Sequence, residues 1–187
     1  TQHAQSGYGN TIAKDIDKAK QFNPDFIICI LHWGNEYQNS FNDEQKLLAE
    51  FLFKKGIKII IGSHPHVLQP VLVYYNDNKN KKVIEKLVVY SLGNFVSNQR
   101  MRYRDGGIIF NLKLMKTSDK SFISDCSYIP VWVYAGIINN DYEFRVIPYK
   151  IYKEKPDIVP LNQDDKQKIE QFYRDTKEIL NNLKEER

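Results

Sequence analysis

The chain has 187 residues, of which 42% are hydrophobic and 27% charged, a balance that fits one domain with a sizeable core. No apolar run approaches the roughly 18 residues that a membrane span needs, and no signal peptide is present. The net charge of +4 is a mild excess, and the densest basic run, at residues 79–82, favours a solvated loop over a nucleic-acid surface, so we expect no nucleic-acid partner.

The first ten residues, TQHAQSGYGN, have the composition of a loop rather than of a chain start. We therefore expect that upstream residues have been cut off, and with them any export signal or anchor. A helix is predicted over residues 11–22, where Ile12, Ile16 and Ala19 share one face. It ends at Asn23, because a residue that precedes proline disfavours the helical region.

Two apolar runs flank a second predicted helix. Residues 25–31 (DFIICIL) and 57–61 (IKIII) are nearly continuous in apolar side chains, which is typical of strands buried on both faces. The helix at residues 43–55 lies between them. This order of strand, helix and strand predicts two parallel strands joined by a crossover helix.

The character of the sequence changes after Pro70. Short strands separated by turn residues follow, which predicts antiparallel hairpins. They cover residues 71–75, 83–90, 107–114, 127–134 and 143–149. A charged amphipathic helix is predicted over residues 163–184.

Cys29 and Cys126 each lie in an apolar run, which favours two buried free thiols over a disulfide. No interior linker divides the chain, so we expect a single domain over residues 1–187.

Three of the four histidines follow the two buried strands. His32 stands at the end of the first strand, and His64 and His66 stand just after the second. Because the carboxyl ends of parallel neighbours meet at one edge of a sheet, the three imidazoles should converge there. Imidazole is the commonest metal-binding side chain. A lone histidine more often caps a strand through hydrogen bonds, but three at two strand ends favour a metal site.

The loop that carries two of these histidines is expected to be short and stiff. Pro65 fixes its own φ and should push His64 toward an extended conformation. Gly62 should allow a sharp turn off the strand. A stiff loop loses less conformational entropy when it chelates a metal, which favours a chelating role for His64 and His66.

Other polar residues fall on the same predicted edge. Glu36 could be a carboxylate that orients an imidazole, or a surface residue. Asn94, in SLGNFV, could offer its amide to a substrate or belong to a plain Gly-Asn turn. Arg100, Arg102 and Arg104 could hold an anionic substrate, although a solvated loop is the favoured reading.

The blocks HWGNEY, GSHPHVLQP and YSLGNFV, in this order and at this spacing, resemble the CapA family, which is linked to bacterial poly-γ-glutamate capsule synthesis. The resemblance runs from about residue 15 to about residue 114. It implies an α/β fold of the calcineurin-like metallophosphoesterase type, a two-sheet sandwich flanked by helices in four layers, αββα. The chain would be the carboxyl-terminal portion of such a domain, incomplete at its amino terminus.

The resemblance also implies a divalent-metal centre. His32 and His64 would share one metal, and His66 would reach toward a second; manganese, zinc and iron are not distinguished. The amino-terminal blocks of the wider group, such as Asp-x-His, Gly-Asp and Gly-Asn-His, do not occur here. The bridging carboxylate would therefore lie on the missing half, and we expect this chain alone to be inactive.

Two functions follow from the resemblance. The first is a metal-dependent hydrolase acting on a phosphoester or related bond, with Glu36 and Asn94 supporting the histidines. The second is a non-catalytic cell-surface scaffold that holds or exports poly-γ-glutamate, an anionic polymer that suits a cationic domain. Expected partners are other capsule-synthesis proteins and the missing amino-terminal half. The expected location is the cell envelope, outside the cytoplasm, with a membrane anchor in the absent region.

Overall fold

The computed structural model describes residues 4–78 and 81–186. Its elements, in chain order, are α1 (Ala4–Lys20), β1 (Ile28–His32), α2 (Asp43–Lys54), β2 (Ile59–Ser63), β3 (Leu68–Asn78), β4 (Lys81–Leu92), β5 (Gly106–Lys116), β6 (Ser121–Ile138), β7 (Asp141–Pro148), α3 (Tyr149–Glu154) and α4 (Gln163–Ile179). The predictions for the first three residues and for positions 79 and 80 of the basic run lie outside the described residues.

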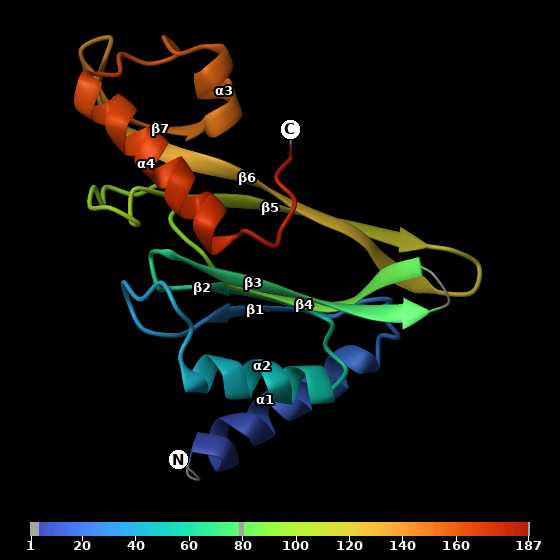
Figure 1. The fold of residues 1–187 in the computed structure, drawn as a ribbon. Helices are drawn as coiled ribbons and strands as arrows, with labels where there is room; N and C mark the ends of the chain where they lie inside the picture. The colour runs from blue at the N-terminus through green and yellow to red at the C-terminus, as the bar shows by residue number, and fades with distance from the viewer. Residues whose placement is uncertain (1–3, 79–80, 187) are drawn as a thin grey trace.

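The strands form two layers with helices on both outer sides (Figure 1). Helices α1 and α2 lie against the layer of β1 to β4, and α3 and α4 lie with the layer of β5 to β7. The strand path runs β1-β2-β4-β6-β5, with β3 on β4 and β7 on β6. In the described residues the two layers join through the pairing of Ile84 in β4 with Ile123 in β6. The α/β sandwich expected from the sequence is therefore present.

Three parallel strands define the edge where the histidines lie. β1 pairs with β2, and β2 pairs with β4, both in parallel register. Helix α2 makes the crossover from β1 to β2, so the predicted parallel pair is confirmed. Asn42 caps α2 by accepting from the backbone N–H of Gln45, whose side chain accepts in return from the Asn42 N–H. Because β1, β2 and β4 run parallel, their last residues, His32, Ser63 and Leu92, lie at the same edge of the sheet.

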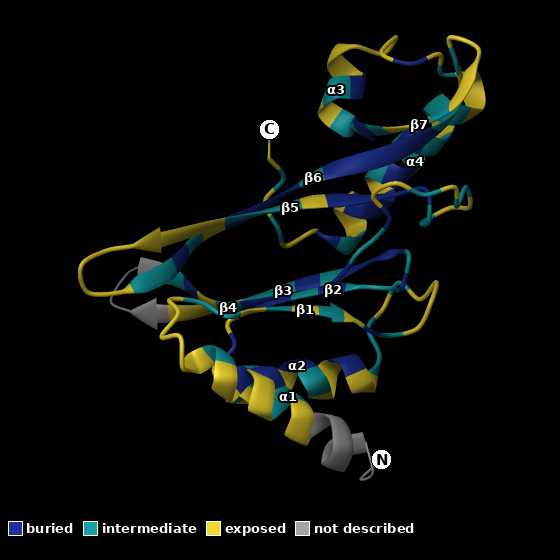
Figure 2. Cartoon of the chain, turned by 180° about the vertical axis from the view of Figure 1, so that it is seen from behind, coloured by how far each residue is buried: buried dark blue, intermediate teal, exposed yellow. Residues whose placement is uncertain are grey.

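Two apolar cores hold the layers together, and Figure 2 shows much of β6, which borders one of these cores, as buried. One core lies between α1, α2 and the outer face of the parallel strands, and includes Ile16, Leu52, Ile60, Val88 and Tyr90. The other lies between the strand layers and beneath α4, and includes Ile59, Leu87, Val89, Tyr128, Trp132 and Phe172. Each such side chain contributes roughly 1.5–3 kcal/mol when fully buried.

Several boundaries differ from the sequence prediction. Helix α1 begins at Ala4, inside the segment predicted to be a loop, because each residue added to a helix already anchored by buried Ile16 gains a hydrogen bond. β3 begins at Leu68 and runs through Pro70, which is tolerated because β3 is an edge strand that pairs with β4 alone. Helix α4 ends at Ile179, and α3 was not predicted.

Both cysteines are free, as predicted; Cys126 is buried and Cys29 half-buried. Burial raises the pKa of the Cys126 thiol to about 11, so this thiol stays protonated and unreactive near neutral pH.

Among the helices that the structure describes, none combines the length and the apolar composition needed to cross a lipid bilayer.

Candidate metal centre

Three loops meet at the carboxyl edge of the parallel strands: residues 33–42 after β1, 64–67 after β2, and 93–105 after β4. The first two are tied together through their backbones. The N–H of Trp33 donates to the carbonyl of Ser63 (3.1 Å), and the N–H of Tyr37 donates to the carbonyl of Pro65 (2.7 Å). The loop that carries Glu36 is therefore held against the loop that carries His64 and His66.

The structure brings the predicted histidines to this edge. The ring centroids of His32 and His64 are 4.4 Å apart, and those of His64 and His66 are 6.1 Å apart. One ligand atom from each of Glu36, His64 and His66 lies within 4.8 Å of the others. His32 is not part of that three-residue set, although its ring lies beside His64. Glu36 is thus a candidate metal ligand beside His64 and His66, whereas the sequence analysis offered it as a carboxylate that orients an imidazole or as a surface residue.

The loop backbone is strained where the candidate ligands sit. His64 has a φ of 101°, His66 of 58° and Tyr37 of 64°. The expectation that Pro65 would make His64 extended is therefore wrong: His64 lies in the positive-φ region. Such backbone costs on the order of 1–3 kcal/mol per residue and is concentrated at functional sites. The surrounding structure must offset this cost, because it fixes the two imidazoles in positions that the local backbone disfavours.

Gly62 serves a different purpose from the one predicted. It lies within β2 and makes no sharp turn. A Cβ at this position would stand 2.2 Å from the carbonyl oxygen of Tyr90 and 2.3 Å from Nε1 of Trp33. The indole of Trp33 is buried there and donates from Nε1 to the Tyr90 carbonyl (2.8 Å). Gly62 therefore provides the space for Trp33, the residue that leads from β1 into the Glu36 loop.

Asn94 selects the tautomer of the neutral His66 imidazole. Its side chain is buried, and its amide nitrogen donates to the carbonyls of His66 (3.2 Å) and Arg104 (2.8 Å). Its Oδ1 must therefore accept, and it lies 2.9 Å from Nδ1 of His66. This contact places the proton of the neutral imidazole on Nδ1 and leaves the Nε2 lone pair for a ligand. The amide of Asn94 is thus engaged with protein groups.

A buried glutamine pair, which the sequence analysis missed, supports the Glu36 loop. Gln69 is fully buried and donates from Nε2 to the carbonyls of Gln38 (2.8 Å) and Ser40 (3.0 Å). Its Oε1 accepts from Nε2 of Gln45 in α2 (2.9 Å). The sequence feature that could have indicated this pair is Gln69 within the apolar run of GSHPHVLQP. A polar side chain among strand residues needs hydrogen-bond partners once it is buried.

Two of the three arginines in the loop after β4 anchor that loop. Arg100 donates from Nη1 to the carbonyl of Val133 (2.5 Å), and its guanidinium lies 5.0 Å from the ring centroid of Trp132. Arg102 makes a two-pronged ion pair with the buried carboxylate of Asp175 in α4 (2.9 and 2.8 Å). The side chain of Arg102 remains 58% exposed, and neither guanidinium is directed to the cluster by these contacts.

Asp105 is a buried carboxyl behind the same loop. Its Oδ2 accepts from Nε1 of Trp132 (2.7 Å), whereas Oδ1 has no hydrogen-bond partner among the described residues. Removal from water raises the pKa of this carboxyl, against a smaller lowering effect of the Trp132 hydrogen bond. The carboxyl is thereby shifted toward its neutral form.

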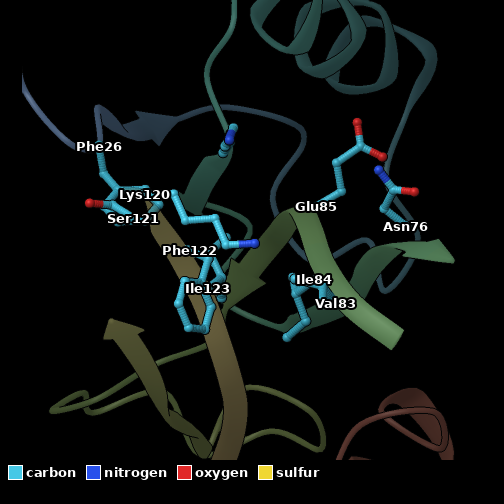
Figure 3. Close-up of a pocket in the computed structure, with 10 residues that line it drawn as sticks. Phe26, Asn76, Val83, Ile84, Glu85, Lys120, Ser121, Phe122 and Ile123 are labelled. Carbon is cyan, nitrogen blue, oxygen red and sulfur yellow. The ribbon is translucent and has the colours of Figure 1, made fainter. Parts of the chain in front are cut away.

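A cavity of about 420 Å³ lies at the other end of the parallel strands, where Ile84 of β4 pairs with Ile123 of β6 (Figure 3). Its lining is mixed, with apolar Phe122 and Ile123 beside Lys58, Lys120 and Glu85. The histidines do not line it, so it is separate from the metal-type cluster.

The donor set of the cluster fits a divalent transition metal. Two imidazole nitrogens and one carboxylate oxygen are the ligand types that zinc, manganese and iron accept in proteins. The arrangement of His66, with Nδ1 held by Asn94, is the arrangement usual for a metal-binding imidazole, whose second nitrogen is fixed by a neighbouring group.

Comparison with known proteins shows similarity between part of this chain and capsule-synthesis proteins. The family model described as bacterial capsule synthesis protein PGA_cap matches residues 1–99. The chain is 40% identical over 100 residues to the PGA biosynthesis protein CapA of Bacillus subtilis (strain 168), and 36% identical over 104 residues to the capsule biosynthesis protein CapA of Bacillus anthracis. These alignments cover 52% and 54% of this chain but only 24% and 23% of the relatives.

Proposed function

This chain belongs to the bacterial capsule synthesis protein PGA_cap family, and from that premise we propose that it works in the biosynthesis of a poly-γ-glutamate capsule. The two relatives, both named for capsule or PGA biosynthesis, support this proposal. A role in capsule synthesis belongs at the cell envelope, which is where we place the protein. Other capsule-synthesis proteins are its expected partners.

We further propose that the cluster is a divalent-metal site of the hydrolase type. The observation that carries this proposal is the convergence of ligand atoms from Glu36, His64 and His66 within 4.8 Å. A bound divalent metal would supply Lewis acidity and a water of lowered pKa for attack on a phosphoester or related bond. His64, His66 and Glu36 would hold the ion, and Asn94 would keep the Nε2 atom of His66 available to it.

His32 and a second metal ion are not accounted for by the cluster of Glu36, His64 and His66. The ring of His32 is exposed and lies beside His64, so it can add a further ligand to an ion bound there. The described cluster supplies the ligands of one ion. A second ion, as the resemblance implies, would need ligands beyond Glu36, His64 and His66.

Metal analysis of the full chain tests this proposal. The chain is dialysed against manganese or zinc, and the bound ion is counted by atomic emission for the wild type, His64→Ala and His66→Ala. We expect about one ion per wild-type chain and loss of most of it in both variants. His3→Ala is the matched control, since His3 belongs to neither strand-end motif. Equal metal content in all four proteins would refute the proposed site.

The alternative function is a scaffold that holds the anionic polymer without cleaving it. The net charge of +4 favours it, since a cationic surface attracts a polyanion. The two functions differ in turnover by the full-length protein, since this chain alone is expected to be inactive. Metal-dependent cleavage of a phosphodiester that is lost in His64→Ala supports the hydrolase. Salt-sensitive binding of poly-γ-glutamate without any turnover supports the scaffold.

A further inference from the structure

The third arginine of the loop after β4 is held differently from the other two. Arg104 stacks on the aromatic ring of Tyr37, with its Cζ atom 3.5 Å from the ring centroid. Tyr37 in turn lies beside the candidate centre, since its ring centroid is 6.2 Å from that of His66. The guanidinium of Arg104 is therefore packed on the residue that borders the metal-type cluster.

The backbone of Arg104 is tied to the same cluster. Its carbonyl accepts from Nδ2 of Asn94 (2.8 Å), the amide whose Oδ1 contacts His66. Its own N–H donates to the carbonyl of Met101 (2.9 Å) and closes a turn. Asn94 thus links the main chain of Arg104 to the imidazole of His66, so the two residues are positioned together.

Among the described residues, no carboxylate forms an ion pair with Arg104. Across residues 4–78 and 81–186, the ion pairs within 4 Å engage Arg102 and Arg145 among the arginines but not Arg104. The polar side-chain contact of its guanidinium is to the sulfur of Met101, 3.6 Å from Nη1. The residue is half-buried. A half-buried cation that is stacked in place, with most of its five N–H donors open, is ready for an incoming anion.

We propose that Arg104 is the anion-binding residue of the candidate metal centre, and that it holds a phosphoryl or carboxylate group of the substrate beside Glu36 and His66. This proposal rests on the proposed function. Phosphate and carboxylate oxygens both accept two parallel hydrogen bonds from a guanidinium. The stack on Tyr37 lowers the entropy lost when these bonds form. Arg104 lies beyond residues 1–99, the part matched by the family model, so the family match does not assign this role.

Anion binding can be measured on the full chain without turnover. Inorganic phosphate and γ-glutamylglutamate are each titrated into the wild type, Arg104→Gln, Arg104→Lys and the control Arg145→Gln, by calorimetry, with and without manganese. Arg145 is a matched control because it is an exposed arginine on β7, paired with Glu143. Far-UV circular dichroism checks that every variant is folded.

We expect Arg104→Gln to weaken anion binding about tenfold or more, since the lost hydrogen bonds are charge-assisted. Arg104→Lys should recover only part of it, because a lysine lacks the planar fork. Arg145→Gln should bind as the wild type does. Preference for phosphate would assign a phosphoester substrate, and preference for the dipeptide a glutamyl polymer; either supports the role of Arg104.

Wild-type affinity in Arg104→Gln, equal losses in Arg104→Gln and Arg145→Gln, or no binding of either anion to the wild type would overturn the proposal. These results are separable from failure of the metal site. Manganese content is counted independently, and we expect Arg104→Gln to retain it, whereas His64→Ala loses it. A chain that binds no metal but loses anion affinity in Arg104→Gln alone would keep Arg104 as an anion-binding residue and reject the metal centre.

Discussion

At the scale of single residues, the contact between Asn94 and His66 connects the fold to the chemistry. The Asn94 amide is fixed by two carbonyl acceptors, so its oxygen can only accept from His66. A histidine whose proton is fixed on Nδ1 presents Nε2 to a metal. The sequence left Asn94 as either a turn residue or a substrate contact, whereas the observed hydrogen bonds favour a positioning role.

Asn94→Ala removes the acceptor for His66 and the two donors to carbonyl groups. We expect metal affinity to fall about 10- to 100-fold, the usual loss when a group that orients a metal ligand is removed. The variant should also lose roughly 1–3 kcal/mol of stability, because buried carbonyls lose their donors. Competition titration with a chelating dye measures the affinity. Unaltered affinity in a folded variant would leave Asn94 with a structural role only.

Asp105 provides a pH-dependent prediction at the same scale. Burial raises the pKa of its carboxyl above the value of 3.8 expected in the unfolded chain. The protonated carboxyl contributes its full stability below the unfolded-state pKa of 3.8, and this contribution is lost as the pH rises through the higher pKa of the folded state. Asp105→Asn mimics the neutral form, so it should unfold at a higher temperature than the wild type at neutral pH.

This advantage of Asp105→Asn should shrink as the pH falls toward 4, because the wild-type carboxyl then takes up its proton in both states. Thermal unfolding followed by circular dichroism between pH 4 and pH 7 is the measurement. A stability difference that does not change over this range would show that desolvation does not dominate at Asp105.

At the scale of elements, the candidate centre depends on loops that are fixed by hydrogen bonds to the neighbouring helices and strands. The Glu36 loop is held by Gln69 at the start of β3, which is itself held by Gln45 in α2. The loop after β4 is held by two of its own arginines: Arg102 pairs with Asp175 of α4, and Arg100 donates to the carbonyl of Val133 in β6. Rigid helices and strands thus support each loop that brings a side chain to the site.

Gln69→Leu tests the support of the Glu36 loop. It leaves two loop carbonyls and the Gln45 amide without partners in the interior. Each unsatisfied group costs about 1–3 kcal/mol, so denaturant unfolding should show a clear loss of stability. Hydrogen exchange in residues 33–42 should become faster, and metal affinity should fall because Glu36 is no longer held near His64. Unchanged exchange in this loop would contradict the supporting role assigned to Gln69.

The elements also show which features a sequence can predict. The strands and their parallel order follow from long apolar runs and from the helix between them, so β1, α2 and β2 were found where expected. The prediction that β1 is buried on both faces is wrong, because β1 is an edge strand whose Ile28 and Ile30 are exposed. The positive φ values of Tyr37, His64 and His66 were not foreseen, because tertiary contacts impose them against local preference. The partners of Arg102 and Gln69 were missed for the same reason, since each lies on a distant element.

At the scale of the whole molecule, the parallel layer ends in an edge strand with exposed apolar side chains. Ile28 is 46% exposed and Ile30 is 78% exposed, on the strand whose carboxyl end carries His32. In register they lie beside Ile59 and Ile61 of β2, on the face directed to the other strand layer. The described part of β5 to β7 covers Ile59 but not these two residues, so this part of the sandwich is open beside the candidate centre.

The central claim is that Glu36, His64 and His66 bind one divalent metal ion. It is tested most directly by anomalous diffraction from crystals of the chain grown with zinc, recorded on both sides of the zinc absorption edge. We predict one strong anomalous peak, about 2.0–2.2 Å from Nε2 of His66, from a ring nitrogen of His64 and from a Glu36 carboxylate oxygen. An absence of anomalous density at these three residues in zinc-saturated crystals would contradict the account.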